Sequence, residues 1–251
     1  MEAYSSFAKV YDELMDNIPY ESWCKYLSEL LKRYSVDSGL VLDMGCGTGN
    51  ITQRLAESGY DMIGIDNSLE MLMIARDKDK SKEILYLLQD MRSFELYGTV
   101  RAVVSICDSM NYILEEEELL MVFKGVNNYL DPGGVFIFDM NTVYKYQELL
   151  GENTIAESRE NCCFIWDNYF YEDEQVNEYE LSLFIKEEGD MFRRFRETHF
   201  QKAYSVETVK ALLIKGGLEF VAVYDAFTWD PPSEDSERIY FVAREKGKEV
   251  K

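Results

Sequence analysis

The chain has 251 residues, enough for one large α/β domain with an insertion or for two small domains. Its 47 acidic residues outnumber its 26 basic residues, and the formal net charge at pH 7 is -21. Such a charge repels the phosphates of a nucleic acid and an anionic membrane surface, so we expect neither as a partner.

The cysteines indicate a reducing environment. They number five, and none are spaced as C-x-x-C. Cys162 and Cys163 would point to opposite faces of a strand, which makes them poor partners for a disulfide or a shared metal. We therefore predict reduced thiols, no metal site and a cytoplasmic location. The sequence shows no secretory signal and no run of about 18 apolar residues, so we also predict no membrane span.

Two amphipathic helices are expected over residues 4–16 and 20–34, where apolar side chains recur at helical spacing. They precede the first expected strand and could fold over its end. Their aromatic side chains, Tyr11 among them, would then line a ligand site or only pack the helices onto the domain.

A nucleotide-binding corner follows. The apolar Val41-Leu42 leads into Asp43-Met44-Gly45-Cys46-Gly47-Thr48-Gly49 and then into an amphipathic stretch over 51–58, which predicts strand, tight turn and helix. Glycine lets the backbone turn with positive φ and lets a ligand approach closely. The carboxylate of Asp43 would repel a pyrophosphate and attract an ammonium or sulfonium group. The charge therefore favours S-adenosylmethionine over NAD as the ligand.

Asp43-Met44-Gly45-Cys46-Gly47-Thr48-Gly49 resembles the first motif of the class I S-adenosylmethionine-dependent methyltransferases. Two later stretches, Asp90-Met91 and Leu130-x-Pro132-Gly133-Gly134, also match that family, and the resemblance covers residues 1–150 and 203–245. It implies an α/β fold: a seven-stranded, mostly parallel Rossmann-like sheet of order 3-2-1-4-5-7-6, with helices on both faces.

Five expected strands end in or next to an aspartate. These aspartates are Asp43, Asp66, Asp90, Asp108 and Asp139. Because parallel α/β sheets bind ligands at the carboxyl ends of their strands, we expect these carboxylates around one crevice. Asp66 lies 21 positions after Gly45, where a carboxylate would accept hydrogen bonds from both ribose hydroxyls.

The resemblance also implies a cofactor site. In the family, an acidic residue at the position of Asp90 accepts from the adenine amino group, and the next backbone amide meets the ring. The cofactor residues that we predict are Tyr11, Asp43, Gly45, Cys46, Gly47, Asn50, Asp66, Asn67, Met71, Asp90, Met91, Asp108 and Ser109. Asn111 and Tyr112 are predicted to line the acceptor pocket.

The pattern changes over 151–202 to long period-two stretches, at 162–171, 176–185 and 191–201, separated by acidic turns. We predict an antiparallel β insertion that serves as a lid, substrate region or homodimer surface. The cofactor domain would consist of 1–150 and 203–251. A helix over 205–215 and strands over 218–224 and 238–243 would complete its sheet.

By this resemblance, the chain is predicted to be an enzyme that transfers a methyl group to a nitrogen or oxygen of a small molecule. Its single histidine, His199, shares a strand face with Glu197 and could act as a base, orient the acceptor or be structural. Two other functions stay open. A non-catalytic S-adenosylmethionine-binding regulator would lack an acceptor pocket, and an NAD-linked oxidoreductase leaves Asp43 and Asp90 unexplained. A protein acceptor is also possible for an acidic enzyme.

Overall fold

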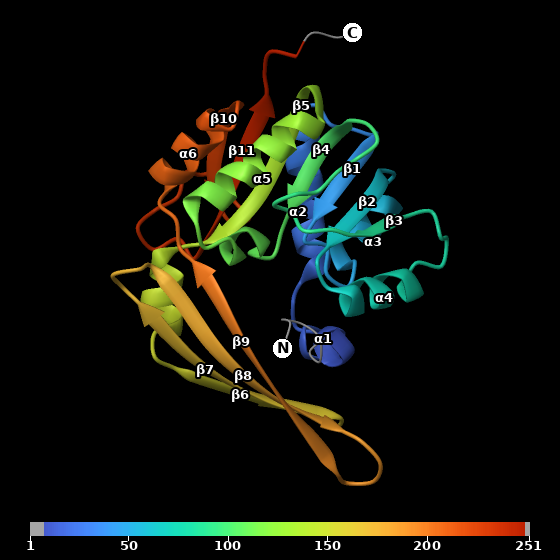
Figure 1. Cartoon of the computed structure of the whole chain (residues 1–251), viewed down its shortest axis with the longest axis vertical. Helices are drawn as coiled ribbons and strands as arrows, with labels where there is room; N and C mark the ends of the chain where they lie inside the picture. Colours follow the sequence, from blue (N-terminus) through green and yellow to red (C-terminus); the bar gives the residue numbers. More distant parts are fainter. Residues whose placement is uncertain (1–7, 249–251) are drawn as a thin grey trace.

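The computed structural model describes residues 8–248. Within that range the chain forms a seven-stranded sheet and a separate four-stranded sheet (Figure 1). The large sheet has the order β10-β11-β5-β4-β1-β2-β3. Its strands are β1 (Leu40–Met44), β2 (Asp61–Asp66), β3 (Leu85–Leu88), β4 (Val100–Ser105), β5 (Leu130–Asn141), β10 (Leu218–Asp225) and β11 (Arg238–Glu245).

The predicted strand order 3-2-1-4-5-7-6 is confirmed, because β11 and β10 are the seventh and sixth strands of this sheet once the insertion is left out of the numbering. Strands β1 to β5 pair in parallel, and β11 pairs antiparallel with both β5 and β10. The central strands β1 and β4 are apolar because both of their faces are covered.

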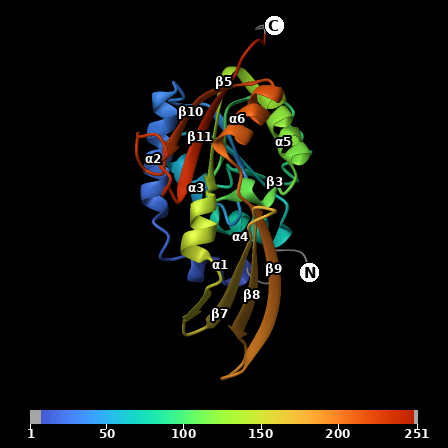
Figure 2. The ribbon, with the colours of Figure 1, turned by 90° about the vertical axis from the view of Figure 1, so that its left-hand side faces the viewer.

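Helices cover both faces of the large sheet (Figure 2). On one face, Leu30 and Leu31 of one helix and Leu55 of another pack against the sheet. On the other, Phe123 packs against Phe136. The helices and helical turns are α1 (Ala8–Leu14), α2 (Tyr20–Arg33), α3 (Asn50–Glu57), α4 (Leu69–Lys78), η1 (Ser109–Tyr112), α5 (Glu116–Tyr129), η2 (Lys145–Leu150) and α6 (Val206–Lys215).

The four-stranded sheet extends from the carboxyl edge of the large sheet (Figure 1). It is antiparallel and contains the three expected strands, β7 (Cys162–Tyr171), β8 (Val176–Lys186) and β9 (Phe192–Lys202). An additional edge strand, β6 (Thr154–Ser158), pairs with β7. This strand has five residues, and it is too short and too polar to give a period-two signal. The sequence therefore did not predict β6.

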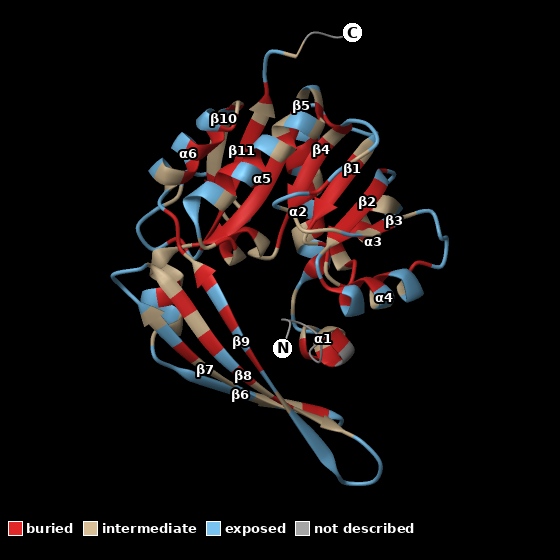
Figure 3. Cartoon of the chain, in the orientation of Figure 1, coloured by how far each residue is buried: buried red, intermediate tan, exposed pale blue. Residues whose placement is uncertain are grey.

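Along β8 and the second half of β9, buried residues alternate with more exposed ones, whereas β6 and the far end of the hairpin are mostly exposed (Figure 3). Leu181 and Leu183 of β8 pack against Val10 and Leu14 of α1. Helix α1 thus lies between the insertion and the large sheet. The helix that we expected over 4–16 is described from Ala8 and ends at Leu14, and the earlier part of that expectation falls outside the described residues.

All five cysteines are free thiols, as predicted. No helix between residues 8 and 248 is long and apolar enough to cross a membrane. Over the same range, no three His, Cys, Asp or Glu side chains gather in a way that could hold a metal ion.

Candidate active site

The glycine corner joins β1 to α3, and the space beside Gly47 is open. Gly45, Gly47 and Gly49 all have positive φ, and α3 begins directly afterwards at Asn50. A Cβ on Gly45 would lie 2.7 Å from the hydroxyl of Ser109, so no larger side chain fits there. A Cβ on Gly47 would meet no atom within 4 Å. The backbone at Gly47 therefore leaves room for a ligand.

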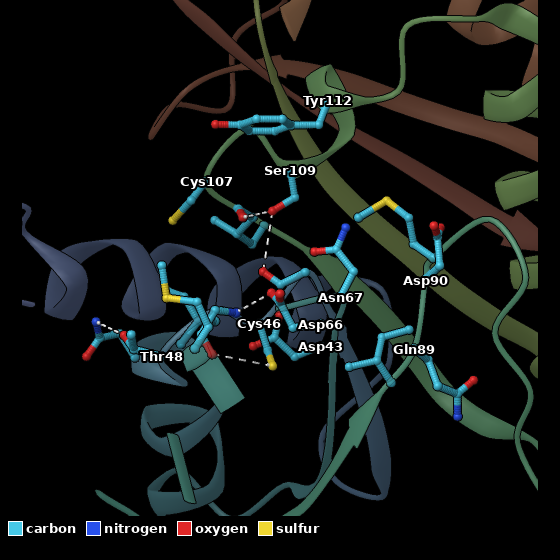
Figure 4. A pocket seen from close by; sticks show the side chains of 18 of the residues that line it. Asp43, Cys46, Thr48, Asp66, Asn67, Gln89, Asp90, Cys107, Ser109 and Tyr112 are labelled. Carbon is cyan, nitrogen blue, oxygen red and sulfur yellow. Dashed lines mark hydrogen bonds between the residues drawn. The ribbon is translucent and has the colours of Figure 1, made fainter. Parts of the chain in front are cut away.

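A pocket opens above this corner, at the carboxyl ends of β1, β2 and β4 (Figure 4). Every residue that we predicted for the cofactor lines it, except Asp108. The pocket continues to Tyr112, whose ring lies across from Asp43 and Asp66 in this view.

Asp66 organises the turn beside the pocket. Its carboxylate accepts hydrogen bonds from the amides of Gly47 and Ser68, each at 2.8 Å. Burial raises the pKa of Asp66, although these amides favour its charged form. The hydroxyl of Ser68 in turn accepts from the amide of Met71 and caps α4. One carboxylate thus connects the glycine corner to the next helix.

Asp43 lies deeper than the sequence suggested. It is 2% exposed, and one oxygen accepts a hydrogen bond of 2.6 Å from the hydroxyl of Thr52. Burial raises the pKa of Asp43 to about 7, and the nearby charge of Asp66 acts in the same direction. Asp43 is therefore partly neutral near pH 7 until a cation in the pocket favours its charged form.

Asp90 lines the pocket from its rim. Its carboxylate receives three bonds from the guanidinium of Arg92, which also contacts Glu118 at 2.8 Å. The Arg92 hydrogen bonds hold the pKa of Asp90 below its usual range. Asp90 is therefore a charged group here, in contrast to Asp43.

Several known proteins that resemble this chain are methyltransferases. A family model for a methyltransferase domain matches residues 41–134. YqeM of Bacillus subtilis (strain 168), which carries the name "Putative methyltransferase YqeM", is 38% identical over 243 residues. The match covers 96% of each chain.

The chain belongs to the class I S-adenosylmethionine-dependent methyltransferases.

Solved structures agree with this methyltransferase in fold. An S-adenosylmethionine-dependent methyltransferase from Clostridium acetobutylicum ATCC 824 is 30% identical, covers 98% of this chain and 100% of its own, and has a TM-score of 0.85. The amino pentose methyltransferase CalS10 of Micromonospora echinaspora, solved with S-adenosylmethionine bound, is 18% identical. It covers 98% of this chain and 99% of its own, with a TM-score of 0.75. At that identity the likeness concerns the fold alone.

Two of the five strand-end aspartates do not line the methyltransferase's pocket, which corrects our expectation. The guanidinium of Arg238 lies 2.6 Å from the carboxylate of Asp108 and 2.6 Å from that of Asp139. Asp108 also accepts a hydrogen bond of 2.6 Å from Gln201 of β9. Asp108 and Asp139 are thus bound to a buried arginine, and only Asp43, Asp66 and Asp90 line the pocket.

Asn111 is also outside the pocket, contrary to its predicted contact with the acceptor. It is fully buried, and its side chain accepts from the amide of Asn141 and donates to the carbonyls of Asn141 and Lys202. These bonds fasten η1 to β5 and to the end of the insertion. Its neighbour Tyr112 does line the pocket.

His199 lies behind Tyr112, not on the pocket wall. It is 2% exposed and stacks on Tyr179 with ring centroids 4.8 Å apart. Its Nδ1 is 3.3 Å from the hydroxyl of Tyr112, and its Nε2 is 3.3 Å from the carboxylate of Glu197. The predicted catalytic role of His199 therefore stays a prediction.

Sequence reasoning missed several residues of the pocket wall. The missed residues are Tyr20, Thr48, Ile51, Ile65, Gln89, Arg92, Ile106, Cys107 and Ile113. Cys107 lies two residues after the end of β4, so its place near a strand end was a usable signal. Tyr20 had no such signal, because it reaches the pocket from α2, where side-chain hydrogen bonds with Tyr11 and Asn50 hold it.

The sequence also did not indicate how α1 is attached. The carboxylate of Asp12 in α1 accepts hydrogen bonds from Thr48 at 2.7 Å, Asn50 at 2.9 Å and Lys78 at 2.7 Å. Asp12 therefore binds α1 to the glycine corner and to α4. This contact holds Tyr11 at the pocket.

Proposed function

We propose that this methyltransferase transfers the methyl group of S-adenosylmethionine to a nitrogen or oxygen of a small molecule. The observation that carries the proposal is one pocket lined both by the glycine corner with its carboxylates and by Tyr11, Tyr20 and Tyr112. Tyr112 lies across the pocket from Asp43 and Asp66 (Figure 4). We call the side of the glycine corner the corner end and the side of Tyr112 the tyrosine end.

The corner end suits the donor. Asp66 would bind the ribose hydroxyls, while Asp90 and Met91 would meet the adenine. Asp43 and Gly45 lie where the cationic end of the donor would gain from a carboxylate and close backbone approach. The bound donor supplies an electrophilic methyl group on a sulfonium. The protein then accelerates transfer by aligning the acceptor and excluding water.

The tyrosine end suits a small acceptor. Ile106 and Ile113 provide apolar contact beside the tyrosines, and the carboxylates favour an uncharged or cationic acceptor. Arg92 is a basic residue of the wall, but Asp90 and Glu118 already bind it. An anionic acceptor would therefore find little compensation here.

The insertion over 151–202 would act as the lid and acceptor region of a domain formed by 1–150 and 203–251. Its contacts with α1 support this role, because α1 carries Tyr11 into the pocket. A homodimer through the exposed face of the insertion stays a prediction. The open tyrosine end favours an enzyme over a non-catalytic regulator, for which this space would be filled.

The test has two parts. Calorimetry should detect binding of S-adenosylmethionine and S-adenosylhomocysteine but not of NAD. A panel of small amines, matched with the corresponding alcohols and with phenols, is then assayed for production of S-adenosylhomocysteine. Binding without turnover on any member would contradict the small-molecule proposal and favour a regulator or a protein acceptor. Binding of NAD alone would favour an oxidoreductase.

A further inference from the structure

Three polar side chains lead from the pocket wall into the interior of the insertion. Tyr112 of η1 lines the pocket, His199 of β9 lies behind it, and Glu197 lies two residues earlier on the same strand face. The side chains of His199 and Glu197 are each 1% exposed. Burying an imidazole beside a carboxylate is costly unless the two interact, so this pair is a built feature of the fold.

Nδ1 of the imidazole is 3.3 Å from the Tyr112 hydroxyl. Nε2 is 3.3 Å from Oε2 of Glu197, which is a charge contact and not a hydrogen bond. A lone pair on Nε2 would face this carboxylate, so we assign the proton of the neutral ring to Nε2 and the lone pair to Nδ1, beside the Tyr112 hydroxyl. Tyr179 stacks on the imidazole and hydrogen bonds to Tyr112, which holds both rings in place.

We propose that Tyr112, His199 and Glu197 form a proton relay that deprotonates an amine acceptor. Tyr112 is the catalytic residue, because it touches the acceptor. His199 and Glu197 act through it as positioning residues. The proposal rests on the proposed function and specifies the acceptor as an amine.

The relay moves two protons. The acceptor ammonium gives a proton to the Tyr112 oxygen while the Tyr112 hydroxyl proton moves to Nδ1 of His199. The imidazolium that forms is stabilised by the Glu197 carboxylate. The freed nitrogen lone pair forms the new N–C bond as the C–S bond of the donor breaks. The electron pair of the C–S bond stays on sulfur. The relay returns its proton to water after product release.

The charges of the pocket favour an amine over an oxygen acceptor. An alkylammonium, with a reference pKa of about 10.4 as in lysine, is cationic near neutral pH and has no free lone pair. Asp43, Asp66 and the net charge of -21 attract such a cation, and the relay makes it nucleophilic. A phenol would have to become an anion beside the same carboxylates. An alcohol is a much weaker acid than either.

The first test reads the relay without any acceptor. The chain has a single histidine, so a full-length protein carrying a histidine-free tag gives one pair of imidazole nitrogen-15 resonances. We expect the tautomer with the proton on Nε2. Tyr112→Phe should shift the Nδ1 resonance, and Glu197→Gln should shift the Nε2 resonance. A proton on Nδ1 of the neutral ring, or an Nδ1 resonance indifferent to Tyr112→Phe, would overturn the relay.

The second test uses the amine with the highest turnover in the panel. Tyr112→Phe and His199→Asn should each lower kcat by about 100-fold while calorimetry shows unchanged S-adenosylmethionine binding. Thr198→Ala, on the exposed face of the same strand, is the matched control and should retain wild-type kcat. Equal kcat in wild type and His199→Asn would overturn the relay.

A split between kcat and KM separates the relay from a structural role. Glu197→Gln should lower kcat on the amine while KM and the affinity for S-adenosylmethionine stay at wild-type values, because Glu197 does not line the pocket. An unchanged kcat contradicts the relay. Methylation of alcohols in preference to their matched amines contradicts the amine assignment. Absence of turnover on the whole panel counts against the proposed function, while the tautomer decides the relay.

Discussion

Asp66 ends β2 and Asp139 lies near the end of β5 in the same sheet, yet they have different environments. Asp66 borders the pocket, and backbone amides are its hydrogen-bond donors. Asp139 is fully buried and faces the guanidinium of Arg238 at 2.6 Å. The strand-end position alone therefore does not make an aspartate a ligand-binding group. Antiparallel pairing brings Arg238 of β11 beside β5, where it forms a structural ion pair with Asp139.

The largest expected effect comes from breaking that ion pair. Arg238→Met removes the cation that faces the buried carboxylate of Asp139, which keeps only the hydrogen bonds from the amides of Cys107 and Asp108 among those described. The free energy of unfolding, measured by urea denaturation near pH 7, should fall by about 3–5 kcal/mol. Burial already raises the pKa of Asp139, so the loss should shrink at acidic pH, where the carboxyl is neutral. Arg193→Met is the control, because its side chain is 61% exposed. Equal losses in the two variants would contradict this account.

Asp43 extends the comparison, because it is buried like Asp139 but has no arginine. Its pKa is raised to about 7 from an ordinary value of 3.8, so the folded state holds the proton more tightly than the unfolded chain. Stability without ligand therefore falls as pH rises from about 4 to about 7, by up to about 4 kcal/mol. Asp43→Asn should remove this dependence in urea denaturation at pH 5 and pH 8. Parallel pH profiles for wild type and variant would show that Asp43 titrates normally.

Asp66 and Asp108 provide a direct contrast in ligand binding. Asp66→Asn should weaken S-adenosylhomocysteine binding by about 10- to 100-fold in calorimetry, because the charged acceptor that we propose for the ribose hydroxyls is lost. Asp108→Asn should leave that affinity unchanged, since Asp108 lies outside the pocket wall. An equal loss of affinity in both variants would place Asp108 among the cofactor residues after all.

The smallest effect is expected at the exposed rim. Arg92→Met should change the free energy of unfolding by less than about 1 kcal/mol, because the side chains of Arg92 and Asp90 are 41% and 33% exposed. The lowered pKa of Asp90 should return toward its ordinary value in carbon-13 NMR titration, since its main cause is the Arg92 hydrogen bond. A loss of unfolding free energy comparable with that of Arg238→Met would show that the Arg92–Asp90 pair stabilises the fold.

Local sequence features were sufficient for most of the strands and helices and for the residues around the glycine corner. Strand, glycine turn and helix follow one another without interruption around Gly45 to Gly49, so chain continuity alone brings these residues together. The parallel order of the sheet then sets Asp66 and Asp90 beside them. Side chains close to a strand end are placed by the strand itself, which is why the residues predicted for the cofactor, apart from Asp108, lie in one pocket.

Long-range packing decided the rest. Periodicity and turn chemistry act over a few residues, and they specified the glycine corner and the presence of a β insertion. The sheet order followed from the resemblance to the methyltransferase family. Only the tertiary structure placed Arg238 between Asp108 and Asp139, set Asn111 in the core and brought His199 behind Tyr112. These contacts join residues that are 87 to 130 positions apart, apart from the short link of Asn111 to β5. No local pattern encodes which distant side chain will meet a buried charge, because that depends on how the packed elements meet in space.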